Sequence, residues 1–134
     1  MTQTGELDSA DEGQLRVVVA DDDPLARAVI CEVIANADTL ELVGVAHDAA
    51  SAVELVVERA PDVAVLDWMM PGGGGPQASR EIVEKSPETE IVALTASESP
   101  EASMDMLRAG AKSILVKGTP PEDIVRTIQV AKRL

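Results

Sequence analysis

The chain has 134 residues, 46% of them hydrophobic but only 1% aromatic, and its 24 acidic and 11 basic residues give a net charge of −13. This charge argues against direct binding to nucleic acid, whose phosphates attract cations, and against binding to an anionic membrane surface. The length predicts one domain, and the composition predicts an aliphatic core. Residues 1–13 carry four acidic residues and no basic one, so we expect a disordered acidic tail there and a folded domain over residues 14–134.

Five short apolar runs mark the expected strands, at residues 16–20, 41–46, 62–66, 90–94 and 112–116. They are too short and too uniformly apolar to be half-exposed hairpin strands, which alternate polar and apolar residues. We therefore expect strands buried in a parallel sheet. The run 41–46 is the most polar of the five, which indicates a strand at the edge of that sheet.

Helical patterns of apolar residues separate these runs, and their ends carry residues typical of helix termini. Four helices are expected to begin with a proline, at Pro24, Pro76, Pro100 and Pro120. Three polar residues are expected to cap helix N-termini: Asp23, Asp48 and Ser99. Residues 119–122 fit a capping box, and Gly110 is a typical helix stop. Five helices alternating with five strands predict an α/β fold, a doubly wound parallel sheet in a three-layer sandwich.

Polar residues stand where four of the five apolar runs end. Asp21 and Asp22 follow the first run, Asp67 the third, Thr95 the fourth and Lys117 the fifth. The carboxyl ends of parallel strands share one edge of a sheet, which is where open α/β sheets bind ligands. Carboxylates gathered there repel one another, and a hard cation such as Mg²⁺ relieves that repulsion. With a hydroxyl and an ammonium group beside them, this set suits phosphoryl transfer to an aspartate.

Four segments of the chain carry a resemblance to a known family. The chain is similar to the receiver domain of two-component response regulators in the segments VVVADDDPLAR, PDVAVLDWMMPGGG, IVALTAS and ILVKG, which have the family's order and spacing. The resemblance covers residues 15–133. It implies a flavodoxin-like (βα)5 fold with five parallel strands in the order 2-1-3-4-5.

The resemblance implies a role for each acidic residue at the strand ends. Asp67 is the expected phospho-acceptor and also a metal ligand. The expected cofactor is Mg²⁺, with Asp22 as a direct ligand and Asp21 as a ligand mainly through water. The backbone carbonyl of Met69 is expected to supply a further metal ligand. Carboxyl groups this close together should titrate as a coupled group.

Thr95 and Lys117 complete the site that the resemblance implies. Thr95 is expected to donate its hydroxyl to a phosphoryl oxygen after phosphorylation. Lys117 is expected to pair with Asp67 at rest and with the phosphoryl group afterwards. Asp23, although it stands beside the other two acids, is expected to act only as a helix cap.

The chain departs from the usual pattern of the family at several positions. An aromatic residue commonly stands three positions before the lysine, where this chain has Ile114, so an aromatic switch coupled to Thr95 is absent or rebuilt. Gly118 stands where many members have a proline that follows a cis peptide. Met69 and Ser97 occupy positions that tune autodephosphorylation in the family. Neither side chain positions water strongly, so we expect a slow to moderate loss of phosphate.

Several other residues are expected to have structural roles. His47, the only histidine, is expected at the surface, and Cys31 is expected to be a buried and unreactive thiol because its helical surroundings are apolar. Gly72–Gly75 is expected to form a permissive loop, since no Gly-Lys-Ser/Thr sequence follows it. Trp68 is expected to pack beside the acceptor and report on the site. Three apolar residues could form a partner surface, but most of them are expected to pack on the sheet: Met104, Met106 and Leu107.

These features predict a phosphorylation-dependent signalling switch and not an enzyme that turns over external substrates. A sensor histidine kinase or a phosphotransfer protein would phosphorylate Asp67 and so change a surface that binds a downstream protein effector. Homodimerisation is a further expectation from the resemblance. It would use the fourth and fifth helices, which are expected to begin at Pro100 and Pro120, and the fifth strand at residues 112–116. Because the sequence has no signal peptide and no apolar run of membrane-spanning length, we expect a cytoplasmic protein. It would be a stand-alone receiver or one cut from a larger regulator.

Two alternative functions stay open on the sequence alone. The missing aromatic at Ile114 favours a protein-binding module that keeps the pocket without relying on phosphorylation, and Asp67→Asn would then leave partner affinity unchanged. A Mg²⁺-dependent phosphohydrolase with an aspartyl nucleophile is the other alternative. Such enzymes commonly need a second acid close after the nucleophile, where this chain has Met69.

Overall fold

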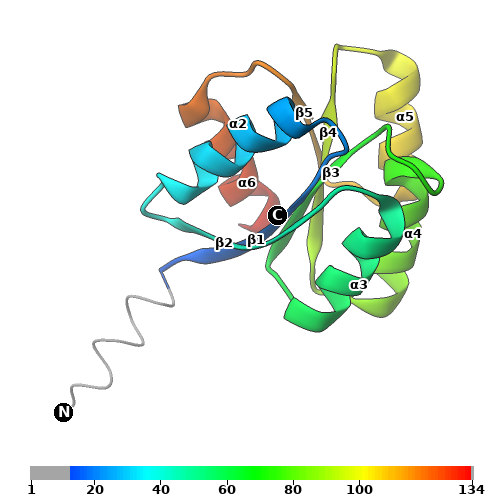
Figure 1. Ribbon diagram of the computed structural model, residues 1–134, viewed down its shortest axis with the longest axis horizontal. Coiled ribbons are helices and arrows are strands. Elements are labelled where there is room, and N and C mark those ends of the chain that lie inside the picture. Colours follow the sequence, from blue (N-terminus) through cyan, green and yellow to red (C-terminus); the bar gives the residue numbers. More distant parts are fainter. Residues whose placement is uncertain (1–12, 134) are drawn as a thin grey trace.

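The computed structural model describes residues 13–133 as a parallel sheet between two layers of helices (Figure 1). The expected acidic tail lies outside the described residues, apart from Gly13, and so does Leu134. None of the described helices has the length and apolar character that crossing a membrane requires. The expected cytoplasmic location stays a prediction.

Strands and helices alternate along the described chain. The strands are β1 (Leu15–Ala20), β2 (Leu40–Ala46), β3 (Val63–Asp67), β4 (Glu90–Thr95) and β5 (Ser113–Val116). The helices are α2 (Pro24–Ala35), α3 (Ala49–Arg59), α4 (Gly74–Lys85), α5 (Pro100–Ala109) and α6 (Pro121–Arg133). Each strand begins and ends within one residue of its predicted bounds. Asp67 and Thr95 are thereby the last residues of their strands rather than the first residues after them.

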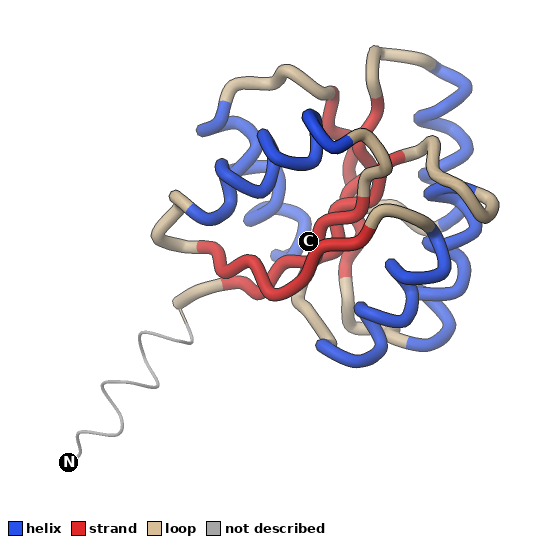
Figure 2. Tube along the Cα trace, in the orientation of Figure 1, coloured by secondary structure: helices blue, strands red, loops and turns tan. Residues whose placement is uncertain are grey.

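The strands form one sheet in the order β2-β1-β3-β4-β5, and every neighbouring pair is parallel. Figure 2 shows these strands in red, with the blue helices on both sides of them. This confirms the expected doubly wound α/β sheet, its order and the place of β2 at an edge. The register pairs Ala20 with Leu66 and Asp67 with Leu94. The carboxyl ends of the three central strands therefore lie side by side, which brings together the residues that follow them.

Helices α2 and α6 cover one face of the sheet, and α3, α4 and α5 cover the other (Figure 1). Successive residues of β1 alternate between the two core clusters that result. Val17 and Val19 belong to the cluster under α2 and α6, and Val18 and Ala20 belong to the cluster under the other three helices. This alternation follows from the two-residue period of a strand. The buried core residues are aliphatic or methionine, as the composition predicted.

The predicted caps place most helix ends correctly. The side chains of Asp23, Asp48 and Ser99 each accept a hydrogen bond from a backbone N–H in the first turn of the helix that follows. Gly110 ends α5 with a φ of 117°, a left-handed conformation that favours glycine. These caps fix where the chain leaves the carboxyl edge of the sheet and enters each helix.

Two predicted helix starts are wrong. Helix α4 begins at Gly74, two residues before Pro76, because Gly73 adopts a φ of 97° and lets the helix begin inside the glycine run. Helix α6 begins at Pro121, one residue after Pro120, so the predicted capping box does not form. The hydroxyl of Thr119 instead donates to the carbonyl oxygen of Val116 at 2.6 Å and closes the turn after β5.

The structure also corrects two expectations about burial. Cys31 is half-buried rather than buried, although it packs against the core cluster under α2 and α6. Partial burial raises the pKa of its thiol, and the charge of Arg27 opposes that shift, so the reactive thiolate is still disfavoured. Of the three residues considered for a partner surface on α5, only Met106 is buried, whereas Met104 and Leu107 are 46% and 47% exposed. His47 is exposed, as predicted.

The two ends of the described chain lie together, beside the amino end of β1. Gly13 and Arg133 line one hollow of about 190 Å³ with Leu15, Thr39, Gln129 and Lys132. Because the strands are parallel, this hollow lies at the edge of the sheet opposite to the one where Asp67 stands.

Candidate functional site

Three carboxyl groups meet at the carboxyl edge of the sheet. Because β1 ends at Ala20 and β3 ends at Asp67, the turn after β1 brings Asp21 and Asp22 beside Asp67. One oxygen of each of these three aspartates lies within 4.8 Å of the others. Asp21 is 0% and Asp67 is 4% exposed, whereas Asp22 is open to solvent. Buried carboxylates this close together are unfavourable unless cations lie beside them.

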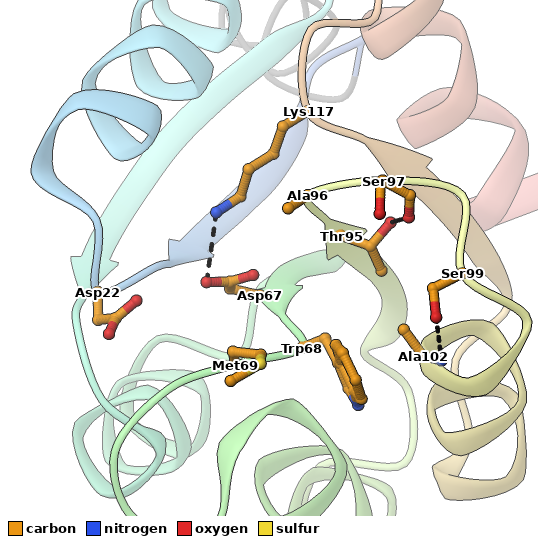
Figure 3. Close-up of a pocket in the computed structure, with 10 residues that line it drawn as sticks. All are labelled: Asp22, Asp67, Trp68, Met69, Thr95, Ala96, Ser97, Ser99, Ala102 and Lys117. Carbon is orange, nitrogen blue, oxygen red and sulfur yellow. Dashed lines mark hydrogen bonds and ion pairs between the residues drawn. The ribbon is translucent and has the colours of Figure 1, made fainter.

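Lys117 supplies a cation from within the protein. Its Nζ lies 3.1 Å from Oδ2 of Asp21. The same nitrogen lies 3.4 Å from Oδ2 of Asp67 (Figure 3). Its backbone N–H donates to the carbonyl oxygen of Thr95 at 2.8 Å, which holds the end of β5 against the end of β4. One ammonium group cannot balance three carboxylates, so the site keeps a negative charge when all of them are ionised.

Burial and mutual contact shift the pKa values of this group. Burial and the neighbouring carboxyl group of Asp21 raise the pKa of Asp67 to about 7, and Lys117 only partly opposes this rise. Burial alone would lower the pKa of Lys117, but its hydrogen bond to Asp21 and the charges of both aspartates raise it overall. Without a further cation, Asp67 therefore holds a proton more readily than an ordinary aspartate does.

The oxygen atoms of the site suit a hard divalent cation. Oδ2 of Asp21 is buried and accepts no hydrogen bond within the described part of the chain. Lys117 lies at ion-pair distance from this oxygen but is poorly directed for a hydrogen bond to it, and donates at 3.4 Å to Oδ1 instead. A buried anionic oxygen without a donor is unfavourable and keeps a lone pair for a metal ion. Mg²⁺ binds through few carboxylates and keeps several waters, which fits two buried acids beside the exposed Asp22.

The remaining predicted residues line a hollow of about 260 Å³ that opens beside Asp67. Its walls are formed by Asp22, Asp67, Trp68, Met69, Thr95, Ala96, Ser97, Ser99, Ala102 and Lys117. Thr95 is 2% exposed, and its hydroxyl donates to the carbonyl oxygen of Ser97 at 3.0 Å (Figure 3). The structure thus brings the predicted acceptor, hydroxyl and ammonium groups to one place, while the roles assigned to them stay predictions.

The loop after Asp67 is held close to the site by helix α4. The N–H of Gly75 donates to the carbonyl oxygen of Trp68 at 2.9 Å. A Cβ atom on Gly75 would lie 2.5 Å from the carbonyl oxygen of Asp67, so only glycine allows this approach. Trp68 points away from Asp67 (Figure 3) and packs against the core cluster under α3, α4 and α5. Met69 is 65% exposed.

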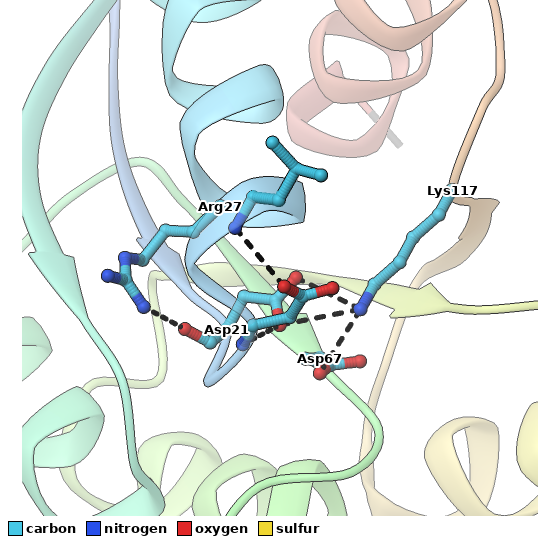
Figure 4. Close-up of polar contacts among 6 residues, drawn as sticks. Asp21, Arg27, Asp67 and Lys117 are labelled. Carbon is cyan, nitrogen blue, oxygen red and sulfur yellow. Dashed lines mark hydrogen bonds and ion pairs between the residues drawn. The ribbon is translucent and has the colours of Figure 1, made fainter.

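The sequence interpretation missed one residue that contacts this site, Arg27 on α2. Its Nη1 donates to the backbone carbonyl oxygen of Asp21 at 2.9 Å (Figure 4). The only sequence signal for this contact is its position four residues after the N-cap Asp23, which places it one turn into the helix. The contact itself depends on the angle at which α2 leaves the sheet, and the pattern of residues does not encode that angle.

Sequence comparison relates the chain to bacterial regulators. A family model described as the response regulator receiver domain matches residues 17–129. The response regulator GacA of Pseudomonas viridiflava is 34% identical over 116 residues, which cover 87% of this chain and 54% of GacA. The oxygen regulatory protein NreC of Staphylococcus epidermidis is also 34% identical over 116 residues, covering 86% of this chain and 53% of NreC. The chain thus spans about half the length of the curated relatives it matches.

Comparison with solved structures gives the same relationship. The signal receiver domain of the response regulator NarL from Mycobacterium tuberculosis superposes with a TM-score of 0.85 at 32% identity, over 90% of this chain and 97% of that chain. The response regulator domain of CheB from Thermotoga maritima superposes with a TM-score of 0.82 at 26% identity, over 90% and 98% of the two chains. Sequence and fold therefore agree that the chain belongs to the receiver domain family of two-component response regulators.

Proposed function

We propose that this receiver domain is a phosphorylation-dependent switch in which Asp67 accepts a phosphoryl group from a sensor histidine kinase or a phosphotransfer protein. The observation that supports this most is the cluster of Asp21, Asp67 and Lys117, which are joined by ion pairs at the carboxyl edge of the sheet. Membership of the receiver family supports phosphorylation-based signalling in general. The residue assignments and the phosphoryl donor are our proposal.

Asp67 must be ionised to attack phosphorus, and its raised pKa of about 7 opposes that ionisation. Asp21, Asp22, Asp67 and the backbone carbonyl of Met69 would hold Mg²⁺, which would neutralise the carboxylates and the phosphoryl oxygens. An electron pair of one Asp67 oxygen forms the new bond to phosphorus. The bond between phosphorus and the donor's histidine nitrogen breaks in line with it, and that nitrogen keeps the electron pair.

Thr95 and Lys117 would bind the transferred group. The Thr95 hydroxyl donates to the carbonyl oxygen of Ser97 in the structure, so it has to turn away from Ser97 to reach a phosphoryl oxygen. Lys117 would exchange its contact with the Asp67 carboxylate for a charge-assisted hydrogen bond to the phosphoryl group. Both residues stand at the ends of β4 and β5, so these movements would change the surface formed by α5, β5 and α6.

The output of this switch would be a change in protein binding at that surface. Met104 and Leu107 expose apolar side chains on α5, which supports this face as the contact for a downstream effector or for a second copy of the chain. The net charge of −13 favours a protein partner over nucleic acid for this domain. The site would act on its own phosphoryl group and would not turn over external substrates.

Incubation with Mg²⁺ and acetyl phosphate, stopped within seconds in acid and followed by intact-mass measurement, tests this proposal. One added phosphoryl group is expected on the wild type and none on Asp67→Asn. The matched control is Asp38→Asn, which changes an exposed acid and should be modified like the wild type. A wild type that stays unmodified while circular dichroism shows it to be folded would contradict the proposal. A binding module that works without phosphorylation would then be the better account.

A further inference from the structure

The buried aspartate Asp21 is held on nearly every side. Its N–H donates to the carbonyl oxygen of Ala46 at 3.1 Å, which ties it to the end of β2. Its Oδ1 accepts hydrogen bonds from the N–H of Asp23 at 3.0 Å and from Lys117 at 3.4 Å. Its backbone carbonyl oxygen accepts the hydrogen bond from Arg27 at 2.9 Å (Figure 4). These contacts leave Oδ2 as the oxygen without a hydrogen bond.

The contact from Arg27 acts on both acids that follow β1. The carbonyl that it binds belongs to the peptide group between Asp21 and Asp22, and a peptide group is planar. Holding the direction of this carbonyl therefore restricts the backbone dihedrals on both sides of the plane, and with them the positions from which the two carboxylates extend. The donor comes from α2 and the acceptor from the end of β1, so the contact also ties the helix to the strand end.

We propose that Arg27 is a positioning residue for the divalent cation at this site, acting through the peptide between Asp21 and Asp22. The inference rests on the metal site of the proposed function, but it does not require that Asp67 accepts a phosphoryl group. Arg27 is half-buried, and among the described contacts it forms a hydrogen bond with the backbone of Asp21 and no ion pair with either carboxylate, so it would act on the cation through that backbone. Residues that orient the ligands of a metal ion commonly change its affinity by about 10-fold to 100-fold when they are removed.

Isothermal titration with Mg²⁺ of the wild type, Arg27→Met and Arg27→Lys tests the inference. Arg27→Met keeps the length and apolar stem of the side chain but loses both donor and charge, and should weaken Mg²⁺ binding about tenfold. Arg27→Lys keeps a cationic donor on a shorter side chain and should recover part of that loss. The matched control is Arg80→Met, which removes the same charge from an exposed position on α4 and should bind like the wild type.

A second measurement follows the apo protein, without any metal. The hydrogen bond from the Asp23 N–H to Oδ1 of Asp21 should open more often in Arg27→Met, which would appear as faster amide hydrogen exchange at Asp23. A residue that only ties α2 to the sheet would lower the melting temperature without changing Mg²⁺ affinity measured well below that temperature.

The inference would be overturned if Arg27→Met bound Mg²⁺ with an affinity within twofold of the wild type. It would also be overturned if Arg80→Met lost as much Mg²⁺ affinity as Arg27→Met, or if the wild type bound no Mg²⁺. A wild type that binds Mg²⁺ but takes no phosphoryl group would contradict the proposed function and leave the inference about Arg27 standing.

Discussion

The ammonium group of Lys117 lies closer to Asp21, at 3.1 Å, than to the predicted acceptor Asp67, at 3.4 Å. The lysine is therefore shared between the two buried acids rather than reserved for one of them. Among the described residues Lys117 forms ion pairs with both acids, so a divalent cation that enters the site has to compete with it.

Replacement of Lys117 by methionine should strengthen Mg²⁺ binding. The variant loses the ammonium group that competes with Mg²⁺ for the carboxylates. Removing a positive charge at this distance from a carboxylate changes the binding of another cation on the order of tenfold. Titration calorimetry at low salt would measure the affinity. Lys112→Met is the control, because Lys112 pairs with Glu90 away from the site, at 3.4 Å, and should bind Mg²⁺ like the wild type. Unchanged or weaker binding in Lys117→Met would show that the lysine does not compete for these carboxylates.

The stability of the metal-free protein should fall as the pH rises. The folded protein raises the pKa of Asp67 from 3.8 to about 7, so the folded state holds a proton that the unfolded chain has already released. This contribution to stability is complete below about pH 4 and is lost as the pH rises through about 7. Urea unfolding measures the free energy of unfolding at about pH 5 and about pH 8. From the lower to the higher pH this free energy should decrease less for Asp67→Asn than for the wild type. Saturating Mg²⁺ should make the decrease of the wild type smaller. Equal decreases in the two proteins would rule out a raised pKa at Asp67.

Alanine at position 75 should destabilise the fold and distort the site. Its Cβ would lie 2.5 Å from the carbonyl oxygen of Asp67, a backbone atom at the strand end that cannot move away easily, and 2.9 Å from the end of the Met106 side chain. We expect a loss of about 1–3 kcal/mol in the free energy of unfolding. Gly44→Ala is the informative comparison, because its Cβ would meet only the end of the flexible Leu55 side chain. A loss in Gly75→Ala no greater than in Gly44→Ala would contradict the close approach.

Alanine at position 79 should leave the protein as stable as the wild type or more so. Ser79 is 0% exposed, and its hydroxyl has no hydrogen-bond partner among the described residues. Removing an unpaired buried hydroxyl from α4 and improving helix propensity should add about 0.5–1 kcal/mol. The buried hydroxyl of Thr89 donates to the carbonyl oxygen of Pro61 at 2.8 Å, so Thr89→Val should cost about 1 kcal/mol or more. Thermal unfolding of both variants checks the contrast, and a destabilised Ser79→Ala would indicate an undetected partner such as water.

The phosphorylated protein should lose its phosphate slowly. Met69 and Ser97 line the hollow beside Asp67, and neither side chain carries a charge that would activate a water molecule. Intact-mass measurement after removal of the phosphodonor should show the adduct for minutes or longer. A lifetime of only seconds would mean that another group in the site directs water to phosphorus.

Much of this architecture could be predicted from the sequence because its signals are local. The strand runs, the caps Asp23, Asp48 and Ser99, and the polar residues at strand ends each depend on a few neighbouring residues. The start of α4 is harder to predict, because the sequence of a glycine run does not show which glycine precedes the helix in a left-handed conformation. The contact of Arg27 with Asp21 depends on how a helix lies against a strand end, and no local pattern encodes that packing.

Gly13 and Arg133 line one hollow at the edge of the sheet opposite to Asp67. A fluorescent protein or another folded module attached directly at Gly13 or Arg133 would therefore leave the entrance to the carboxylates clear. A circular permutant that joins residues 133 and 13 through a short linker should also keep the sheet intact. The same geometry means that a module attached at Arg133 would sense phosphate on Asp67 through the surface formed by α5, β5 and α6, and not by contact with the phosphoryl group itself.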